Sequence, residues 1–290
     1  MAITNLTETA DTWITGIVID FVATSPLNAL GLPGGEVAWD APLVGFSRGD
    51  DPIYLEFKKH IGDFHWTPLE IFQRTFTGVR TTAKDLTVLS WILPQTRSTK
   101  VENAARKVYP SQRWAAARDS GERFNVALRK HVVETLLQAG VPTLAPMLSP
   151  YWSKQTSKGY GFASNWSERH AAYAGGLGTF GLCDGLITPV GKAVRAGSVV
   201  AKLLVPPTLR PYQDHHAYCL YYSHGICQKC VQRCPVEAVS SEGHDKTRCF
   251  GHLESSRYYA RRAYGIEKGG CGLCQVAVPC ESHIPSPEEG

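Results

Sequence analysis

The sequence predicts a layered α+β domain followed by a small C-terminal domain that depends on bound metal. Segments with helix and strand patterns alternate up to about residue 205, and eight of the nine cysteines fall in the last 72 residues. A content of 43% apolar and 19% charged residues is typical of a globular protein. The 290 residues can form one large domain or two smaller ones. We expect a main domain over 1–205 and a second domain over 206–290.

The main domain is predicted to begin irregularly. Its first 80 residues are rich in glycine, proline and aromatic side chains, and only short helices are predicted there, at about 51–61 and 67–76. The apolar run 86–93, which Pro94 ends, has the composition of a buried strand.

A longer helix is predicted after Ser120, because apolar residues repeat at helical spacing up to Ala139 and Gly140 can end the helix. The remaining predicted elements are strands over 141–145, 186–188 and 198–205, and a helix over 167–174 with Ser167 as its cap. Prolines at 206, 207 and 211 predict a linker between the two domains.

Charge is unevenly distributed along the chain. Residues 1–80 hold five Lys and Arg against ten Asp and Glu, residues 81–205 hold sixteen against seven, and residues 206–290 hold nine of each. The formal net charge of +4 treats cysteine as neutral, and two clusters on four thiolates each would bring the loaded protein near neutrality. Nucleic-acid binding is therefore not favoured, although the basic middle could hold an anionic ligand or contact RNA locally.

No stretch approaches the roughly 18 uninterrupted apolar residues of a membrane span. The first ten residues lack a basic patch followed by an apolar run, so no secretory signal is expected and the predicted location is cytoplasmic. Thiols stay reduced in that compartment, and a dense group of cysteines then indicates metal binding before disulfides.

The cysteine spacing is similar to that of a two-cluster ferredoxin. Cys227, Cys230 and Cys234-Pro235 match the last three positions of C-x2-C-x2-C-x3-C-P, a run whose final cysteine ligates the other cluster. His224 occupies the first position, and Cys219, five residues earlier, is the expected substitute.

The second run ends differently. After Cys271 and Cys274 the exchanged thiol is expected at Val278, but it comes two residues later as Cys280. The exchange rule assigns one [4Fe–4S] cluster to Cys219, Cys227, Cys230 and Cys280, and the other to Cys234, Cys249, Cys271 and Cys274. Two alternatives stay open: an all-thiolate zinc site on the two C-x2-C pairs, and a first cluster that uses His224 or is a three-thiolate [3Fe–4S] centre.

Two features together resemble the epoxyqueuosine reductase-like iron–sulfur proteins, relatives of the corrinoid-dependent reductive dehalogenases. One is the paired cysteine tail, including Arg248-Cys249 and the segment 270–275, GCGLCQ. The other is the segment 167–181, SERHAAYAGGLGTFG, which continues through 186–191, LITPVG. The resemblance covers most of 85–280. It implies a nitroreductase-like α/β domain that holds base-off cobalamin, and a two-cluster ferredoxin-like domain that delivers electrons one at a time.

The stretch 160–166, YGFASNW, departs from that family. In epoxyqueuosine reductases an aspartate ahead of the glycine stretch is the proton donor, whereas this stretch contains no acidic residue. The respiratory dehalogenases carry an export signal, which is not expected here. We therefore expect a cytosolic relative that acts on a different substrate.

The glycine stretch satisfies G-x-G-x-x-G, but a dinucleotide site is not favoured. A helix is predicted before it where a strand is needed, and no Asp or Glu occurs between 185 and 213 to hold a ribose. Either the glycines let the backbone approach a large planar cofactor, or they form a turn that binds nothing. The candidate cofactor contacts are Gly175, Gly176, Leu177, Gly178 and Gly181.

Reductive chemistry needs a proton source. Tyr160, Asn165 and Tyr173 are candidate proton donors or substrate ligands. Lys192 and Arg195 are candidates to fix an anionic group or donate a proton, or else are solvated side chains. His170 and Cys183 are expected to be structural, Cys183 as a buried apolar residue.

The sequence thus predicts an oxidoreductase whose two clusters pass electrons to a corrinoid cofactor, for a reductive reaction on a small organic substrate or a nucleoside. The expected partners are that substrate and an external electron donor of the ferredoxin or flavodoxin type. The alternative is a non-catalytic electron carrier, or a reductase for a partner corrinoid protein.

Overall fold

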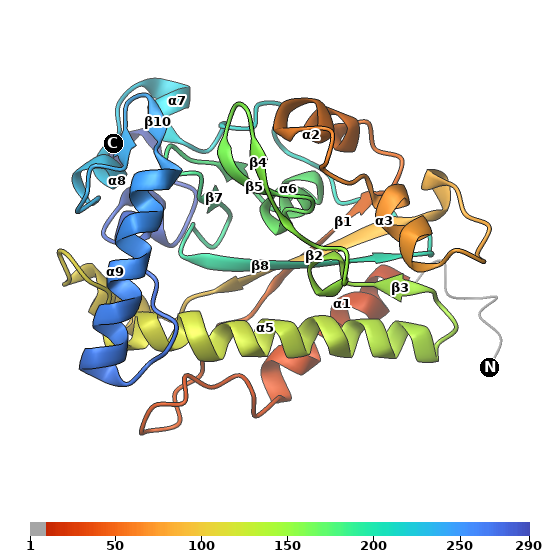
Figure 1. The fold of residues 1–290 in the computed structure, drawn as a ribbon, viewed down its shortest axis with the longest axis horizontal. Helices are drawn as coiled ribbons and strands as arrows, with labels where there is room; N and C mark the ends of the chain where they lie inside the picture. Colours follow the sequence, from red (N-terminus) through yellow and green to blue (C-terminus); the bar gives the residue numbers. More distant parts are fainter. Residues whose placement is uncertain (1–9) are drawn as a thin grey trace.

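A four-stranded antiparallel sheet lies at the centre of the computed structural model, with helices on both of its faces (Figure 1). The structure describes residues 10–290, so nearly all of the segment on which the absence of a secretory signal was predicted lies outside the described residues. The strands of the sheet are, in spatial order, β1 (Leu43–Arg48), β2 (Thr87–Pro94), β8 (Val194–Ala201) and β3 (Thr143–Leu144). The chain therefore has a mixed α+β fold.

Helices and short strand pairs complete the structure. The α-helices are α1 (Ala10–Thr24), α2 (Ile53–Ile61), α3 (Pro68–Thr75), α4 (Arg97–Ala104), α5 (Gln112–Gln138), α6 (Glu168–Ala174), α7 (Leu220–His224), α8 (Lys229–Gln232) and α9 (Lys246–Tyr264). The strands outside the central sheet form three pairs, β4 (Lys154–Ser157) with β5 (Gly161–Ser164), β6 (Thr179–Phe180) with β7 (Leu186–Ile187), and β9 (Val239–Ser240) with β10 (Gly243–His244). Short 3₁₀ turns include η3 (Leu273–Gln275) and η4 (Pro279–Glu281).

Strand β2 is buried along its whole length and divides its side chains between two cores. Leu89, Trp91 and Leu93 face the core that α1 and α5 cover, whereas Val88 and Ile92 face the core on the other side of the sheet. Side chains that alternate between faces are the rule for an extended chain, and a strand covered on both faces is apolar throughout. The continuous apolar run of the sequence has this cause.

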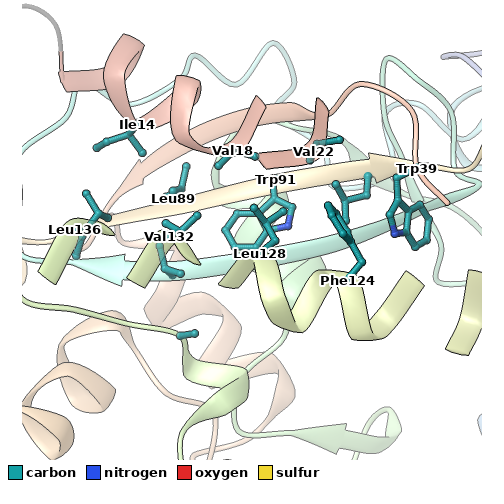
Figure 2. Packing of buried hydrophobic residues seen from close by; sticks show 14 of the residues in the cluster. Ile14, Val18, Val22, Trp39, Leu89, Trp91, Phe124, Leu128, Val132 and Leu136 are labelled. Atoms are coloured by element: carbon teal, nitrogen blue, oxygen red, sulfur yellow. The ribbon is translucent and has the colours of Figure 1, made fainter. Parts of the chain in front are cut away.

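In the first core, side chains of α1 and α5 pack against those of the sheet (Figure 2). Ile14 and Val18 lie four residues apart on α1, and Leu128 and Val132 lie four apart on α5, so each pair projects from one face of its helix. All four belong to the same apolar cluster as Trp91, whose side chain is fully buried. The long helix α5 thereby runs beneath the sheet over nearly the whole length of the molecule (Figure 1).

The prediction that residues 1–80 hold only two short helices was wrong. Both α2 and α3 are present, but α1 and the edge strand β1 lie in the same stretch. The signal for α1 is visible in hindsight, because Ile14, Val18 and Val22 repeat at helical spacing.

Two predicted boundaries also shift. Helix α5 begins after Ser111, whose hydroxyl accepts a hydrogen bond from Trp114 N at 3.2 Å, and Ser120 lies inside the helix. Strand β8 begins and ends four residues earlier than predicted, because it pairs with β2 along its full length, from Val194 opposite Pro94 to Ala201 opposite Thr87.

Other predicted features are confirmed. Gly140 follows α5 with a positive φ of 80°, and Ser167 caps α6 through its hydroxyl. The strand predicted over 141–145 is present as the two-residue strand β3.

The proline-rich segment 206–211 lies against the edge of the sheet. Thr208 donates its backbone N–H to Phe46 O at 2.9 Å, and its hydroxyl accepts from Phe46 N at 2.9 Å. This segment covers the edge strand β1, which would otherwise expose unpaired backbone groups. No helix in the described part of the chain is both long and apolar enough to cross a membrane.

Candidate metal centre

Four cysteines line one small cavity between the cysteine-rich region and the loops that precede β8. Cys219 immediately precedes α7, Cys230 lies in α8 and Cys280 lies in η4, and all three side chains are buried. Cys227 completes the ring of thiols and is partly exposed. Apolar atoms of Gly181, Leu182 and Ile187 form the wall on the main-domain side. These four cysteines are the set that the exchange rule assigns to one cluster, and they are named the first cysteine set below.

Backbone contacts hold Cys280 in that ring. Lys192 N donates to Cys280 O at 2.9 Å, and Ala193 N donates to Glu281 O at 3.3 Å. Gly191 makes this approach possible, because a Cβ there would lie 2.1 Å from Glu281 O and the residue has a φ of 83°. Cys280, which comes two residues later in the sequence than expected, thus lies in a segment that is hydrogen-bonded to the turn before β8.

The other four cysteines gather on the α9 side of the first set, and they are named the second cysteine set: Cys234, Cys249, Cys271 and Cys274. Burial, and then the neighbouring Cys249 and Cys234, raise the pKa of Cys271 to about 11. Cys234 Sγ accepts a hydrogen bond from Ala238 N at 3.1 Å. All four are partly exposed, whereas the first set is mostly buried.

Cys183 lies between the two sets, although the sequence predicts only a buried apolar residue there. The side chain is 6% exposed. The neighbouring thiols of Cys230, in the first set, and Cys274, in the second, lower its pKa well below the ordinary value. Cys183 is thus buried as expected, in a cluster that combines cysteine sulfur with hydrocarbon side chains such as Ile187 and Val239.

Among residues 10–290, Lys192 is the one charged side chain that lines the cavity of the first set. It is 3% exposed, and its Nζ lies 3.5 Å from Cys183 Sγ. Burial alone would lower the pKa of Lys192, but the surrounding cysteine sulfurs, with Cys183 the strongest, outweigh that effect and raise the pKa well above its usual value. Within residues 10–290, no carboxylate comes within ion-pair distance of this ammonium.

The donor chemistry of both sets fits iron–sulfur ligation. All nine thiols are free, and eight fall into two groups of four. Among the described side chains, no group of three or more His, Cys, Asp or Glu residues is spaced to hold a single metal ion. A buried lysine without a carboxylate needs another source of negative charge, and thiolates on a cluster would supply it. The structure therefore contains a cation where an anionic cluster would require one.

His224, the alternative ligand, lies outside the lining of this cavity. It ends α7 with an exposed side chain, and its Nδ1 lies 2.7 Å from Ser223 Oγ. Cys219 takes the place in the ring.

A histidine and an aspartate lie beside the second set. His244 Nδ1 lies 3.1 Å from Asp184 Oδ2. Burial alone would lower the pKa of His244, but Asp184 and then Cys249 raise it to about 10. Spacing gave no indication of this pair, because Asp184 lies 60 residues before His244 in the chain.

The predicted cofactor contacts of the glycine stretch pack mainly against protein. A Cβ at Gly176 would lie 2.7 Å from Leu209 O, and one at Gly178 would lie 2.2 Å from Ile187 O. Gly175 ends α6, and Leu177 is buried against Gly45. The space that these glycines leave is filled by neighbouring backbone, so the geometry gives no support for a corrin beside Gly175–Gly178. Gly181, the last of the stretch, lines the cavity of the first cysteine set.

The predicted proton donors do not converge on one point. Tyr160 is 53% exposed at the turn between β4 and β5, and Lys246 Nζ lies 5.7 Å from the centre of its ring. Asn165 is buried, and its side-chain amide is hydrogen-bonded to Tyr151 O, Ser153 N and Ser153 Oγ at 2.9 to 3.1 Å. These bonds stabilise the loop that precedes β4. Tyr173 is buried in α6, where its ring stacks on Tyr212 and burial raises its pKa.

Arg195 belongs to a buried ionic network between β8 and α5. Its Nη1 donates to Glu122 Oε2 at 2.5 Å, and burial lowers its pKa to about 10. Arg129, which is 2% exposed, bonds Glu122 at 3.3 Å and Glu168 at 3.0 Å. Arg195 and Lys192 therefore contact different parts of the molecule, and neither is a solvated side chain.

His170 packs in an aromatic cluster, as expected of a structural histidine. Its ring centre lies 4.9 Å from that of Phe57 and 4.8 Å from that of Phe180, and its Nδ1 lies 2.8 Å from Ser167 Oγ. Burial lowers its pKa well below the ordinary value.

Comparison with known proteins gives similarity at the level of the fold. No model of a protein family matches the chain, and no curated protein matches it. Similar solved structures include a selenomethionine-labelled epoxyqueuosine reductase (17% identity, TM-score 0.45, covering 87% of this chain and 66% of that chain). They also include epoxyqueuosine reductase from Bacillus subtilis (18%, 0.44, 87% and 66%) and the catabolic reductive dehalogenase NpRdhA with 3-bromo-4-hydroxybenzoic acid (14%, 0.48, 94% and 37%).

The chain is thus structurally similar to both kinds of reductase over most of its length. It spans about two thirds of the length of the epoxyqueuosine reductases and little more than a third of the dehalogenase. Similarity at this level concerns the fold alone.

Proposed function

We propose that this protein is an iron–sulfur oxidoreductase in which two [4Fe–4S] clusters relay single electrons from an external ferredoxin or flavodoxin type of donor. The first cysteine set would hold one cluster and the second set the other, in a ferredoxin-like domain over 206–290. Two successive one-electron deliveries supply the electron pair for a two-electron reduction of a small organic substrate or a nucleoside. The clusters supply electron storage and transfer when bound.

The observation that carries the proposal is the cavity lined by the first cysteine set together with the buried Lys192. Thiols from three separate segments converge there, and the one charge among them has no carboxylate partner within residues 10–290. Leu182 and Ile187 exclude water from this side of the cavity. A thiol-lined cavity with an internal cation suits an anionic cluster better than four free thiols.

The proposed acceptor of the electrons is a corrinoid in the main domain 1–205. This part of the proposal depends on the resemblance of the segments 167–181 and 186–191 to the epoxyqueuosine reductase-like proteins. The packing of Gly176 and Gly178 against protein backbone gives it no support.

The same packing favours a second candidate function. A protein whose glycine stretch serves only to bring backbones together would be an electron carrier, or a reductase for a partner corrinoid protein. Its main domain would dock the partner and carry out no reaction of its own.

Reconstitution of anaerobically purified protein with cobalamin separates the two functions. The oxidoreductase is expected to bind about one cobalt per chain beside its iron and sulfide, with a corrinoid absorption that survives gel filtration. Iron and sulfide without cobalt uptake would favour the carrier. Zinc without sulfide would contradict both.

A further inference from the structure

Lys192 differs from a typical buried lysine, because sulfur atoms and not carboxylates surround it. Its Nζ lies 3.5 Å from Cys183 Sγ, and its backbone N–H bonds Cys280 O at 2.9 Å. The side chain lines the cavity of the first cysteine set and is 3% exposed. Lys192 is thus held at its backbone by Cys280 and at its ammonium by the sulfur of Cys183.

This position favours a role at the cysteines over the proton-donor role that the sequence suggests for Lys192. A proton donor to substrate must reach the substrate, whereas this ammonium faces the cysteines from inside a closed layer. Cys183, which accepts its hydrogen bond, lies beside Cys230 of the first set and Cys274 of the second. The charge therefore lies beside Cys183, which neighbours a cysteine of each set.

A fixed positive charge next to an iron–sulfur cluster favours the reduced state, because reduction adds one negative charge to a cluster that is already anionic. The attraction is strong in a water-excluded site and weak at the surface, where solvent screens it. Hydrogen bonds and charges around the sulfurs are among the factors that set cluster potentials.

We propose that Lys192 is a positioning residue that raises the reduction potential of the cluster on the first cysteine set, with Cys183 holding its ammonium between the two clusters. The inference rests on the proposed iron–sulfur function and goes beyond it by naming the residue that tunes the relay. The charge thereby favours transfer of electrons from the cluster on the second set to the cluster on the first set. Electrons would run from the more exposed second set toward the main domain.

Three variants test this inference: Lys192→Met removes the charge at similar length, Lys192→Arg keeps it, and Lys229→Met is the matched control. Lys229 directly precedes Cys230 but is exposed, so it carries the same charge next to the same set with solvent around it. Iron and sulfide are counted first in each protein. Midpoint potentials then come from an anaerobic redox titration followed by electron paramagnetic resonance.

Lys192→Met is expected to lower the potential of the cluster on the first cysteine set more than that of the other cluster, with full iron content. Lys192→Arg is expected to restore most of the shift, and Lys229→Met to produce much less. A Lys192→Met variant that loses one cluster, while Lys192→Arg keeps both, also supports a requirement for the charge.

Unchanged potentials in a fully loaded Lys192→Met protein would overturn the inference and leave the iron–sulfur proposal intact. Loss of a cluster in both Lys192 variants would overturn it too, because it would show a need for the shape of lysine and not for its charge. Absence of iron and sulfide from the unmodified protein would instead refute the proposed function itself.

Discussion

The sheet region and the cysteine-rich region are built on different physical principles. Around the sheet, two large apolar clusters cover both faces of β2, and the biggest side chains, such as Trp91 and Phe124, are almost completely buried. The cysteine-rich region has a core of few hydrocarbon side chains, among them Val239 and Val278, and the rest of that core consists of cysteine sulfur.

The difference shows which region can hold itself together. Burial of apolar surface stabilises the sheet region at about 25 cal/mol per Å², whether or not metal is present. The segment 219–290 has only short elements apart from α9, and a region of that kind usually obtains its folding free energy from bound metal. Metal dependence should therefore be confined to one part of the chain.

Destroying the clusters should produce the largest effect and separate the two regions. After treatment with an oxidant and an iron chelator, amides of 219–290 are expected to lose protection from hydrogen exchange by orders of magnitude, because their folding depends on metal. Amides of β2, β8 and α5 are expected to stay protected. Hydrogen exchange with mass spectrometry makes the comparison, and equal loss in both regions would refute it.

Arg129→Met should weaken the sheet region and leave the clusters unaffected. It leaves Glu168, whose side chain is only 11% exposed, without its ion-pair partner, and loss of one partner from such a pair costs about 3–5 kcal/mol of unfolding free energy. Arg123→Met is the control, since Arg123 pairs with Asp119 at the surface and its loss should cost at most about 1 kcal/mol. Denaturant unfolding measures both, and similar costs for the two variants would argue against the buried network.

Gly191→Ala should weaken the cysteine-rich region and leave the sheet intact. The new Cβ would lie 2.1 Å from Glu281 O, so the segment that carries Cys280 must move away. We expect loss of about half of the bound iron, at a cost of about 1–3 kcal/mol. Gly225→Ala is the matched control, because Gly225 has a similar φ of 71° but nothing within 4 Å of its Cβ position. Full iron content in Gly191→Ala protein would contradict this account of how Cys280 is held.

Tyr160→Phe should have the smallest effect on either region. The hydroxyl is at an exposed turn, so unfolding free energy is expected to change by no more than about 0.5 kcal/mol and iron content not at all. The ring near Lys246 is retained, so the contact between the β4–β5 hairpin and α9 should persist. A marked fall in iron content would show that this hairpin takes part in holding the second cysteine set.

The parts of the fold that local pattern determines could be predicted from the sequence. The apolar run of β2 and the serine cap of α6 are local signals, and the structure contains both. Strand β1 was not predicted, because its burial comes from β2 and from Thr208, more than 150 residues further along the chain. The predicted start of α5 at Ser120 was wrong because both Ser111 and Ser120 can cap a helix, and the residues around them decide that Ser111 does so.

The same distinction holds at the site. Spacing predicts which cysteines can share a cluster, and the structure brings the first set around one cavity. Lys192 and Cys183 lie 27 or more residues before the nearest of these cysteines, so nothing local connects them with the cluster region. Only the tertiary structure shows that a cation and a ninth sulfur lie between the two sets.

The most direct test of the account is the inorganic content of the intact protein, measured by native mass spectrometry without exposure to air. The account predicts a mass increase of two [4Fe–4S] clusters, with about eight iron and eight sulfide per chain. A protein that carries zinc ions without sulfide, or whose cysteines are joined in disulfides, would contradict it.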